Sequence, residues 1–364
     1  MTSSCWPCAV KCFSMLHLYR PLRVLLLRRA VLVLVVAGVL LTNGCLLRPS
    51  NKVAVPQLLT PVVEADTSRL IEEINRLSTV RSIRGKVDIQ FLDTSFAKCG
   101  VAEKYKTADG TLTVQRPRQI NLVIQIPFIG RDVAQMTSDG ERFRVAVLEG
   151  DERFKRFVKG TNNAVYPKLE TDGAEVDCGG DDKKRSAMNA RAVGALSSLR
   201  PQHFTDALLI YPAAEPGSNL VYAQSEAFEE EPDARTGAKK NARVVRAYYV
   251  LAELQPTGEN RARIVRRFWF DRVGEIRLAR LQNYDEQGKL TTDVVYKETR
   301  TLGEEARYKL PSQIELTRPQ DRYSIRLSYQ APDSVKIDQP YKTDFFDLKN
   351  SWNLPEVDLD ARKP

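Results

Sequence analysis

Alternation of apolar and polar residues recurs along most of the chain, and it limits the possible folds more than any other feature. In the segment KVDIQF, for example, the apolar residues are Val87, Ile89 and Phe91. Successive side chains of a β-strand point to opposite faces of a sheet, so this period of two is typical of antiparallel strands with one buried face. Roughly ten or eleven such segments occur. We therefore expect a long antiparallel sheet.

Two stretches have helical spacing instead. Asp66 or Thr67 can cap the first helix. A second helical stretch spans about residues 186–210 and is expected to break at Pro201. A sheet with one apolar face and amphipathic helices must bury their apolar surfaces together, and a curved sheet wrapped around the helices is the simplest arrangement.

The N-terminal segment carries an apolar run, AVLVLVVAGVLL, that follows two arginines and ends shortly before Cys45. A basic segment followed by an apolar one is typical of a secretory signal, and the cysteine makes it resemble a bacterial lipoprotein signal peptide, in which Cys45 becomes the lipidated first residue. Two alternatives stay open. One is an uncleaved transmembrane helix, although that needs about 20 apolar residues. The other is an ordinary signal peptide in which Cys45 is incidental. Translation can begin at Met1 or Met15.

Removal of residues 1–44 lowers the net charge from +9 to +4, because that segment contains five basic residues and no acid. The mature chain keeps Cys99 and Cys178 besides Cys45. Export favours a disulfide between these two residues, and two separate thiols are the alternative.

Four regions follow from composition. We expect a signal peptide over residues 1–44, a proline-containing tether over 45–64, a folded domain over 65–350 and a C-terminal tail over 351–364. Polar insertions near residues 161–185 and 226–241 are expected to lie on the surface of the folded domain.

No motif points to catalysis, a metal or nucleic acid. The mature chain has one histidine, His203, on which any serine or cysteine triad would depend. The acidic residues between 172 and 182 lack the ordered spacing of a calcium loop. Arginines near Phe268 resemble a nucleic-acid surface, but arginines that alternate on a strand usually form its solvated side. We expect no enzyme activity, no cofactor, no metal site and no nucleic-acid partner.

The order of these segments resembles the bacterial lipoprotein-localisation proteins LolA and LolB, most nearly LolB, which is itself a lipoprotein. The resemblance rests on the first helix, SIRGKVDIQF, GTLTVQRPRQINLVIQIPFIG, SDGERFRV and LSSLRPQHFTDALL, and it continues loosely to LPSQIELTRP. It implies an α+β, mainly antiparallel β fold for residues 65–350. The implied architecture is an incomplete, half-open β-barrel of about 11 strands with a helical lid or plug. The apolar hollow of such a barrel binds acyl chains.

The resemblance assigns roles to residues that the patterns identify. The lipid-binding cavity would be lined by Val87, Ile89, Phe91, Leu112, Val114, Leu122, Ile124, Phe143, Val145, Ile264, Phe268, Phe270, Ile325 and Leu327. The lid would comprise Leu70, Ile74, Leu77, Leu196 and Leu199, tied by an inward Arg266. A solvent-facing edge position is the alternative for Arg266. Phe128 and Ile129 fall where receptor-type members carry a membrane-engaging loop, and inward packing is the alternative for Phe128.

These inferences predict a lipid-anchored envelope protein that binds acyl chains of lipids or lipoproteins. Leu46 follows Cys45 in place of the aspartate associated with inner-membrane retention, so we expect the outer membrane, on its periplasmic side. Its expected partners are the membrane, the acyl chains and a periplasmic carrier protein. The alternative is a non-catalytic sensor or scaffold of the envelope, in which the helices themselves fill the hollow.

Overall fold

The computed structural model describes residues 32–33, 55–93, 103–104, 108–127, 129–149, 152, 155–162, 164, 200–214, 218–258, 260–303 and 308–362. It divides into two units, Met1–Val55 and Pro56–Pro364. In the first unit, Leu32 and Val33 are helical and exposed. Within the described ranges, no helix has the length and apolar character to cross a membrane. The predictions for Cys45, Cys99, Phe128, Cys178, Leu196 and Leu199 lie outside the described residues.

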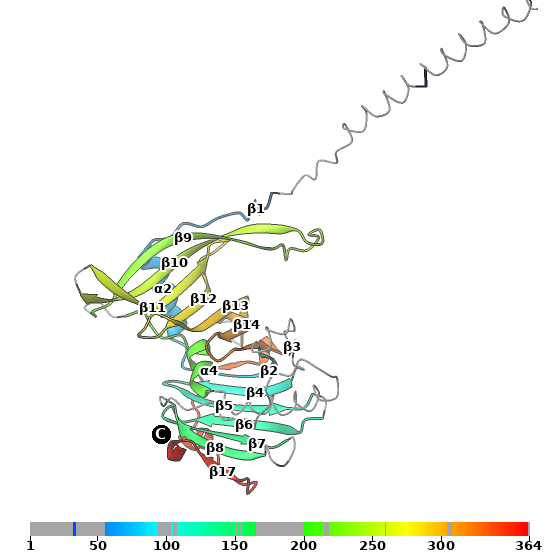
Figure 1. The fold of residues 1–364 in the computed structure, drawn as a ribbon, viewed down its shortest axis with the longest axis vertical. Helices are drawn as coiled ribbons and strands as arrows, with labels where there is room; N and C mark the ends of the chain where they lie inside the picture. Colours follow the sequence, from blue (N-terminus) through cyan, green and yellow to red (C-terminus); the bar gives the residue numbers. More distant parts are fainter. Residues whose placement is uncertain are drawn as a thin grey trace, which may run out of the picture. The chain divides into compact units, whose positions relative to one another are not determined.

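One sheet organises the second unit (Figure 1). Its first half contains β2 (Ser82–Asp93), β4 (Ala108–Gln115), β5 (Gln119–Gln125), β6 (Asp132–Ser138), β7 (Arg142–Val147) and β8 (Arg156–Thr161). Its second half contains β9 (Val221–Pro232), β10 (Arg243–Gly258), β11 (Arg261–Asp271), β12 (Arg277–Tyr284), β13 (Leu290–Leu302), β14 (Tyr308–Arg318) and β15 (Tyr323–Tyr329). The short strands are β1 (Gln57–Leu58), β3 (Glu103–Lys104), β16 (Lys336–Ile337) and β17 (Glu356–Asp358).

Each half of the sheet is an antiparallel meander, and the two halves meet where β15 pairs with β2. Tyr329 lies opposite Val87 and Tyr323 lies opposite Asp93 in this pair. The long strands therefore follow the spatial order β9-β10-β11-β12-β13-β14-β15-β2-β4-β5-β6-β7-β8. In the described residues β8 pairs with β7 and β17, β9 pairs with β10, and no pairing joins β8 to β9, so the sheet is not closed.

The predicted number of strands is wrong, because the described part of the sheet has 17 strands and not about 11. Part of the difference comes from β1, β3, β16 and β17, which have two or three residues each and are too short to show alternation. Residues 226–232, expected at the start of a surface insertion, belong to the 12-residue strand β9. Most of its side chains are exposed on both faces, and an apolar alternation is therefore absent from its sequence.

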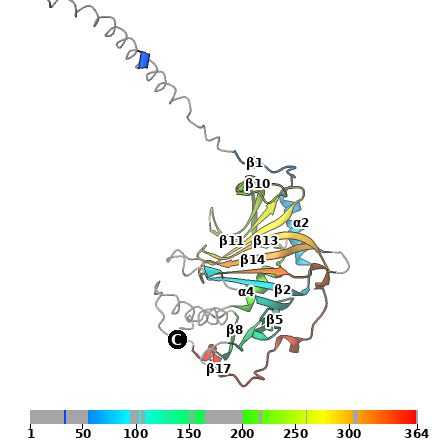
Figure 2. The same cartoon turned by 90° about the vertical axis from the view of Figure 1, so that its right-hand side faces the viewer.

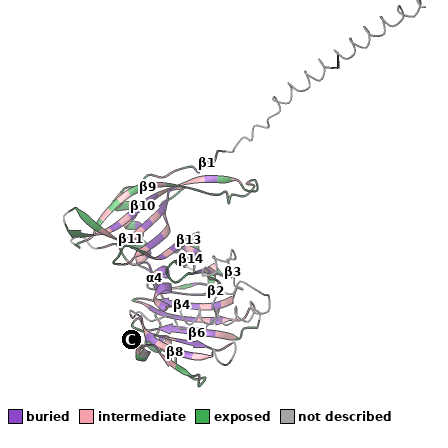
Figure 3. Cartoon of the chain, viewed as in Figure 1, coloured by how far each residue is buried: buried purple, intermediate pink, exposed green. Residues whose placement is uncertain are grey.

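Two helices in the described residues pack against the sheet. Helix α2 (Thr67–Ser78) has Asp66 as its N-cap, whose side chain accepts a hydrogen bond of 2.9 Å from the Arg69 N–H. Helix α4 (Pro201–Leu208) begins at Pro201, where the break was predicted. Proline is well tolerated there because the first turn of a helix has no partner for its N–H groups. Figure 3 shows that buried positions gather on α4 and the strands near it, whereas much of β9 is exposed.

The C-terminal segment runs along the sheet as far as its β8 edge (Figure 2). It contains η4 (Pro332–Ser334), η5 (Thr343–Phe346) and η6 (Asp360–Arg362) in addition to β16 and β17. Strand β16 pairs with β2, and β17 pairs in parallel with β8. Asn121 and Thr137, from β5 and β6, hydrogen-bond to the backbone of Phe345 and Leu348. Residues 351–362, expected in a tail, thus form part of the folded unit.

Candidate functional site

The inner face of the sheet carries the residues that sequence analysis assigned to a cavity. They lie in one buried apolar cluster together with the lid residues Leu70, Ile74 and Leu77 of α2. The cavity residues of this cluster are Val87, Ile89, Leu112, Val114, Leu122, Ile124, Phe143, Val145, Phe268, Phe270, Ile325 and Leu327. Phe91 is partly buried against the cluster and stacks on Tyr323, with 5.8 Å between the ring centres. The structure thus brings together residues from both halves of the sheet.

Ile264 is half-buried and lies outside this cluster. A β-bulge shifts the pairing of β10 with β11 at this point: Glu253 pairs with Arg266, but the next residue, Leu254, pairs with Ile264. An extra residue on one strand interrupts the alternation of faces. Counting back from Phe268 in steps of two therefore fails to identify the face on which Ile264 lies.

Arg266 lies on the inner face, beside Phe268, whose ring centre is 5.0 Å from the guanidinium carbon. It forms a two-bond ion pair with Glu253, at 2.9 and 2.6 Å. It also donates hydrogen bonds to the carbonyls of Tyr211 and Pro212, at 3.2 and 3.0 Å. Arg266 therefore ties the segment that follows α4 to the sheet.

Glu253 is 1% exposed and stands at the centre of this contact. The Tyr222 hydroxyl donates to it at 2.8 Å and accepts a bond of 2.7 Å from the Ala214 N–H. Burial and the hydrogen bond with Glu253 raise the pKa of Tyr222 to about 12, so the hydroxyl keeps its proton at neutral pH. We call Tyr222, Glu253 and Arg266 the latch, because together they hold the backbone of residues 211–214.

Sequence reasoning missed Tyr222 and Glu253. A usable signal exists for Glu253: it occupies the same face as Tyr249 and Leu251 in the apolar run YYVLAEL, where an acid is out of place. A buried carboxylate needs a partner, and a search for an inward arginine on a neighbouring strand would have found Arg266. No comparable signal marks Tyr222, because the sequence of β9 does not alternate.

Helix α4 is held by further polar contacts with the sheet. The Tyr296 hydroxyl donates to the Ala207 carbonyl at 2.9 Å, and Arg116 donates to the Ile210 carbonyl at 2.7 Å. His203 Nδ1 lies 2.8 Å from the Tyr323 hydroxyl. Burial, with a smaller effect of nearby arginines, lowers the pKa of His203 well below its usual value, so its ring is neutral.

This arrangement places an apolar surface beneath α2, α4 and residues 211–214. A chain such as an acyl tail gains about 0.8 kcal/mol for each methylene that it buries. In the structure, however, α2 and α4 already cover the described part of the inner face.

Ile129 is 72% exposed in the turn between β5 and β6. Gln125 and Asp132 close the base of this turn with a hydrogen bond of 2.8 Å. Ile129 is thus accessible, as its predicted contact with a membrane requires.

No family model matches the chain, and no curated protein matches it. Solved structures similar to it include a LolA superfamily protein of Nitrosomonas europaea, which is 13% identical. The match covers 78% of this chain and 98% of that protein, with a TM-score of 0.36. Another is a DUF1329 family protein of Desulfovibrio piger, which is 10% identical. The match covers 78% of this chain and 96% of that protein, with a TM-score of 0.38. A third is a putative outer membrane lipoprotein-sorting protein domain of Vibrio parahaemolyticus, which is 13% identical. The match covers 76% of this chain and 95% of that domain, with a TM-score of 0.36. Likeness at this level does not show family membership.

Proposed function

We propose that this protein binds acyl chains of lipids or lipoproteins on the inner face of its open sheet and that it is not an enzyme. The supporting observation is the combination of one continuous apolar inner face with a latch that holds its cover. The chains would replace contacts that α4 now makes with the sheet. Selectivity for chain structure would be low, because apolar burial is non-directional.

The proposal includes a membrane anchor at Cys45 and a position at the outer membrane, facing the periplasm. The anchor at Cys45 is proposed because the N-terminal segment resembles a lipoprotein signal peptide. An exposed Ile129 suits a second, weaker membrane contact through the turn between β5 and β6. Receipt of lipoproteins from a periplasmic carrier protein, and their insertion into the membrane, are parts of the same proposal.

Native mass spectrometry of the full chain extracted from envelope membranes tests acyl-chain binding. We expect bound lipid or lipopeptide, and we expect it to be lost in Ile124→Asp, which places a carboxylate on the inner face. The matched control is Val123→Asp, since the neighbouring side chain of β5 lies on the other face and is half-buried. Equal binding by the two variants, both shown to be folded, would contradict the proposal.

A scaffold or sensor role is the second candidate. It is favoured by the cover itself, because α2 and α4 fill the described part of the inner face with the protein's own side chains. A full chain that leaves the membrane with no bound acyl species, and takes up none when the latch is weakened, would support this candidate over the first.

A further inference from the structure

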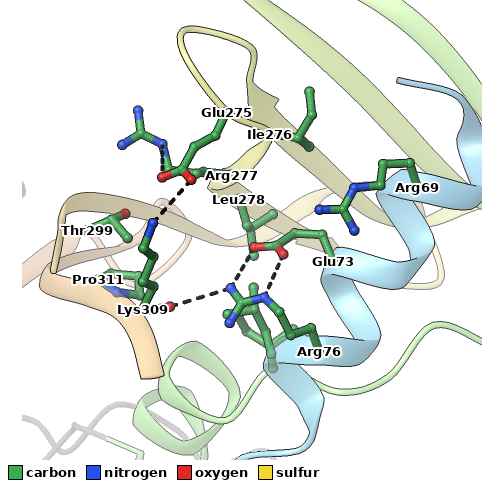
Figure 4. Close-up of a pocket in the computed structure, with 12 residues that line it drawn as sticks. Arg69, Glu73, Arg76, Glu275, Ile276, Arg277, Leu278, Thr299, Lys309 and Pro311 are labelled. Carbon is green, nitrogen blue, oxygen red and sulfur yellow. Dashed lines mark hydrogen bonds and ion pairs between the residues drawn. The ribbon is translucent and has the colours of Figure 1, made fainter. Parts of the chain in front are cut away.

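A half-open pocket of about 370 Å³ lies between α2 and strands β12, β13 and β14 (Figure 4). Its apolar lining includes Leu77, Ile210, Ile276 and Leu278. All four also belong to the buried apolar cluster of the inner face. The pocket is therefore a place where solvent meets the interior of the sheet.

Six charged side chains also line the pocket, and cations outnumber carboxylates among them. The carboxylates are Glu73 and Glu275; the cations are Arg69, Arg76, Arg277 and Lys309. Arg69, Glu73 and Arg76 share one face of α2, because residues four and seven apart lie above one another on a helix. Figure 4 shows Lys309 and Glu275 on the strand side, across from them.

The two inner cations have strong partners. Arg76 forms a two-bond ion pair with Glu73 at 2.7 and 2.8 Å, and Glu73 is 5% exposed. This pair raises the pKa of Arg76. Arg277 donates a bond of 2.8 Å to Asp271, whose carboxylate is buried behind it. The first pair lies within α2, and the second joins β12 to β11.

The two outer cations are held loosely. Arg69 pairs at 3.1 Å with Glu72, and the two side chains are 54% and 66% exposed. The Lys309 ammonium lies 3.5 Å from Glu275, with exposures of 64% and 49%. Exposed pairs of this kind contribute about 0–1 kcal/mol. An incoming anion can therefore take Arg69 and Lys309 from their present partners at little cost.

We propose that this pocket receives the anionic, phosphate-bearing head of an amphiphile whose chain enters the interior past Leu77, Ile210 and Ile276. The inference rests on the proposed acyl-chain binding and narrows it to a charged class of ligand. A free phosphate would leave the apolar lining unused, and a neutral head could not replace the weak, exposed carboxylate partners of Arg69 and Lys309. An anionic head with an attached chain satisfies both parts of the pocket.

Titration calorimetry of the full chain in a non-ionic detergent tests the inference. The three probes are dihexanoyl phosphatidic acid, dihexanoyl phosphatidylcholine and inorganic phosphate. We expect the phosphatidic acid to bind about tenfold more tightly than the phosphatidylcholine, which has the same chains. In the double variant Arg69→Gln, Lys309→Gln we expect this preference to disappear, with binding of phosphatidylcholine unchanged.

The matched control is Lys297→Gln, Lys349→Gln. It removes the same charge from exposed pairs outside the pocket and should keep the preference. If the double variant retains the preference, or if the wild type has none while binding both lipids, the anionic site is refuted and acyl binding stands. If inorganic phosphate binds as tightly as phosphatidic acid, the chain adds nothing to binding, and the inference that the ligand is an amphiphile is refuted. Inorganic phosphate that binds while neither lipid does would refute acyl-chain binding itself.

Discussion

At the scale of single residues, the interior of the sheet contains a few buried polar side chains among the apolar ones. Glu253 and His203 are both buried, and each has a specific polar partner on another element: Arg266 of β11 for Glu253 and Tyr323 of β15 for His203. Leaving one such group without its partner costs more than the contact itself contributes. Changes at these positions should therefore produce large, local and measurable effects.

Glu253→Gln is expected to weaken the latch while keeping the shape of the side chain. The two amides that report on the latch are those of Ala214, bonded to Tyr222, and Ala213, bonded to Asn75. Breaking a buried ion pair costs about 3–5 kcal/mol, so we expect hydrogen exchange at these amides to quicken by tenfold or more. Hydrogen exchange with mass spectrometry measures this.

The control for the latch is Asp293→Asn, which weakens a two-bond pair with Arg280, at 2.7 and 2.6 Å, remote from residues 211–214. Exchange at residues 213 and 214 should be unchanged in this variant. Similar exchange in the two variants would show that the Glu253 pair does not hold the segment.

His203 should make the folded state sensitive to mild acid. Its pKa in the folded protein is lowered by burial first, then by Arg318 and Arg200. Below a pH of about 6.5 the unfolded chain takes up a proton at this residue and the folded chain does not, so stability falls as the pH falls. The loss is about 1.4 kcal/mol for each pH unit.

Urea unfolding of the wild type and of His203→Gln between pH 7 and pH 5 checks this prediction. The glutamine has no titrating proton, so the wild type should lose stability more steeply over this range. Parallel curves would mean that the ring takes up its proton in the folded state as well.

At the scale of elements, the sequence predicted those strands and helices whose two sides differ. Strands β2, β5 and β15 alternate because one face packs on the interior, and α2 was found from its apolar stripe and its cap. The part of β9 over residues 226–232 was missed because neither of its faces is deeply buried. The bulge opposite Glu253 moved Ile264 out of the predicted set, since a bulge leaves no mark in an alternating pattern.

The cap of α2 gives a prediction at this scale. Sequence analysis left Asp66 and Thr67 as alternatives, and in the structure Asp66 accepts the bond from the Arg69 N–H. Asp66→Ala should lower the free energy of unfolding by about 1 kcal/mol. Asp66→Asn, which keeps an oxygen acceptor, should lower it much less. Urea unfolding compares them, and equal losses in the two variants would exclude a capping role.

At the scale of the whole molecule, the order of the strands could not be derived from the sequence. Strand β2 pairs with β15, so residues more than 200 positions apart lie side by side. Alternation identifies which face of a strand is buried but not which strand lies next to it. The same reasoning applies to the latch, since Arg266 was found on its own strand while its contacts with residues 211 and 212 depend on the topology.

The C-terminal segment should protect one edge of the sheet, because an uncovered strand edge can pair with another molecule. Strand β17 covers β8: the Phe157 N–H donates to the Pro355 carbonyl and the Leu359 N–H to the Lys159 carbonyl, each at 2.9 Å. Leu359 also belongs to the buried cluster. Removal of residues 354–364 should therefore lower the midpoint of thermal unfolding and increase light scattering at high protein concentration.

A chain that ends after Asp360 is the matched control for this truncation. It keeps β17, Leu359 and the hydrogen bond of 2.9 Å between Thr161 and Asp360. Loss of a buried leucine contributes about 2–5 kcal/mol, so the longer truncation should melt well below this control. If scattering rises while the two forms melt together, the segment covers the edge without stabilising the fold. If neither quantity differs, residues 354–360 add nothing to the sheet, and the edge of β8 is protected by other means.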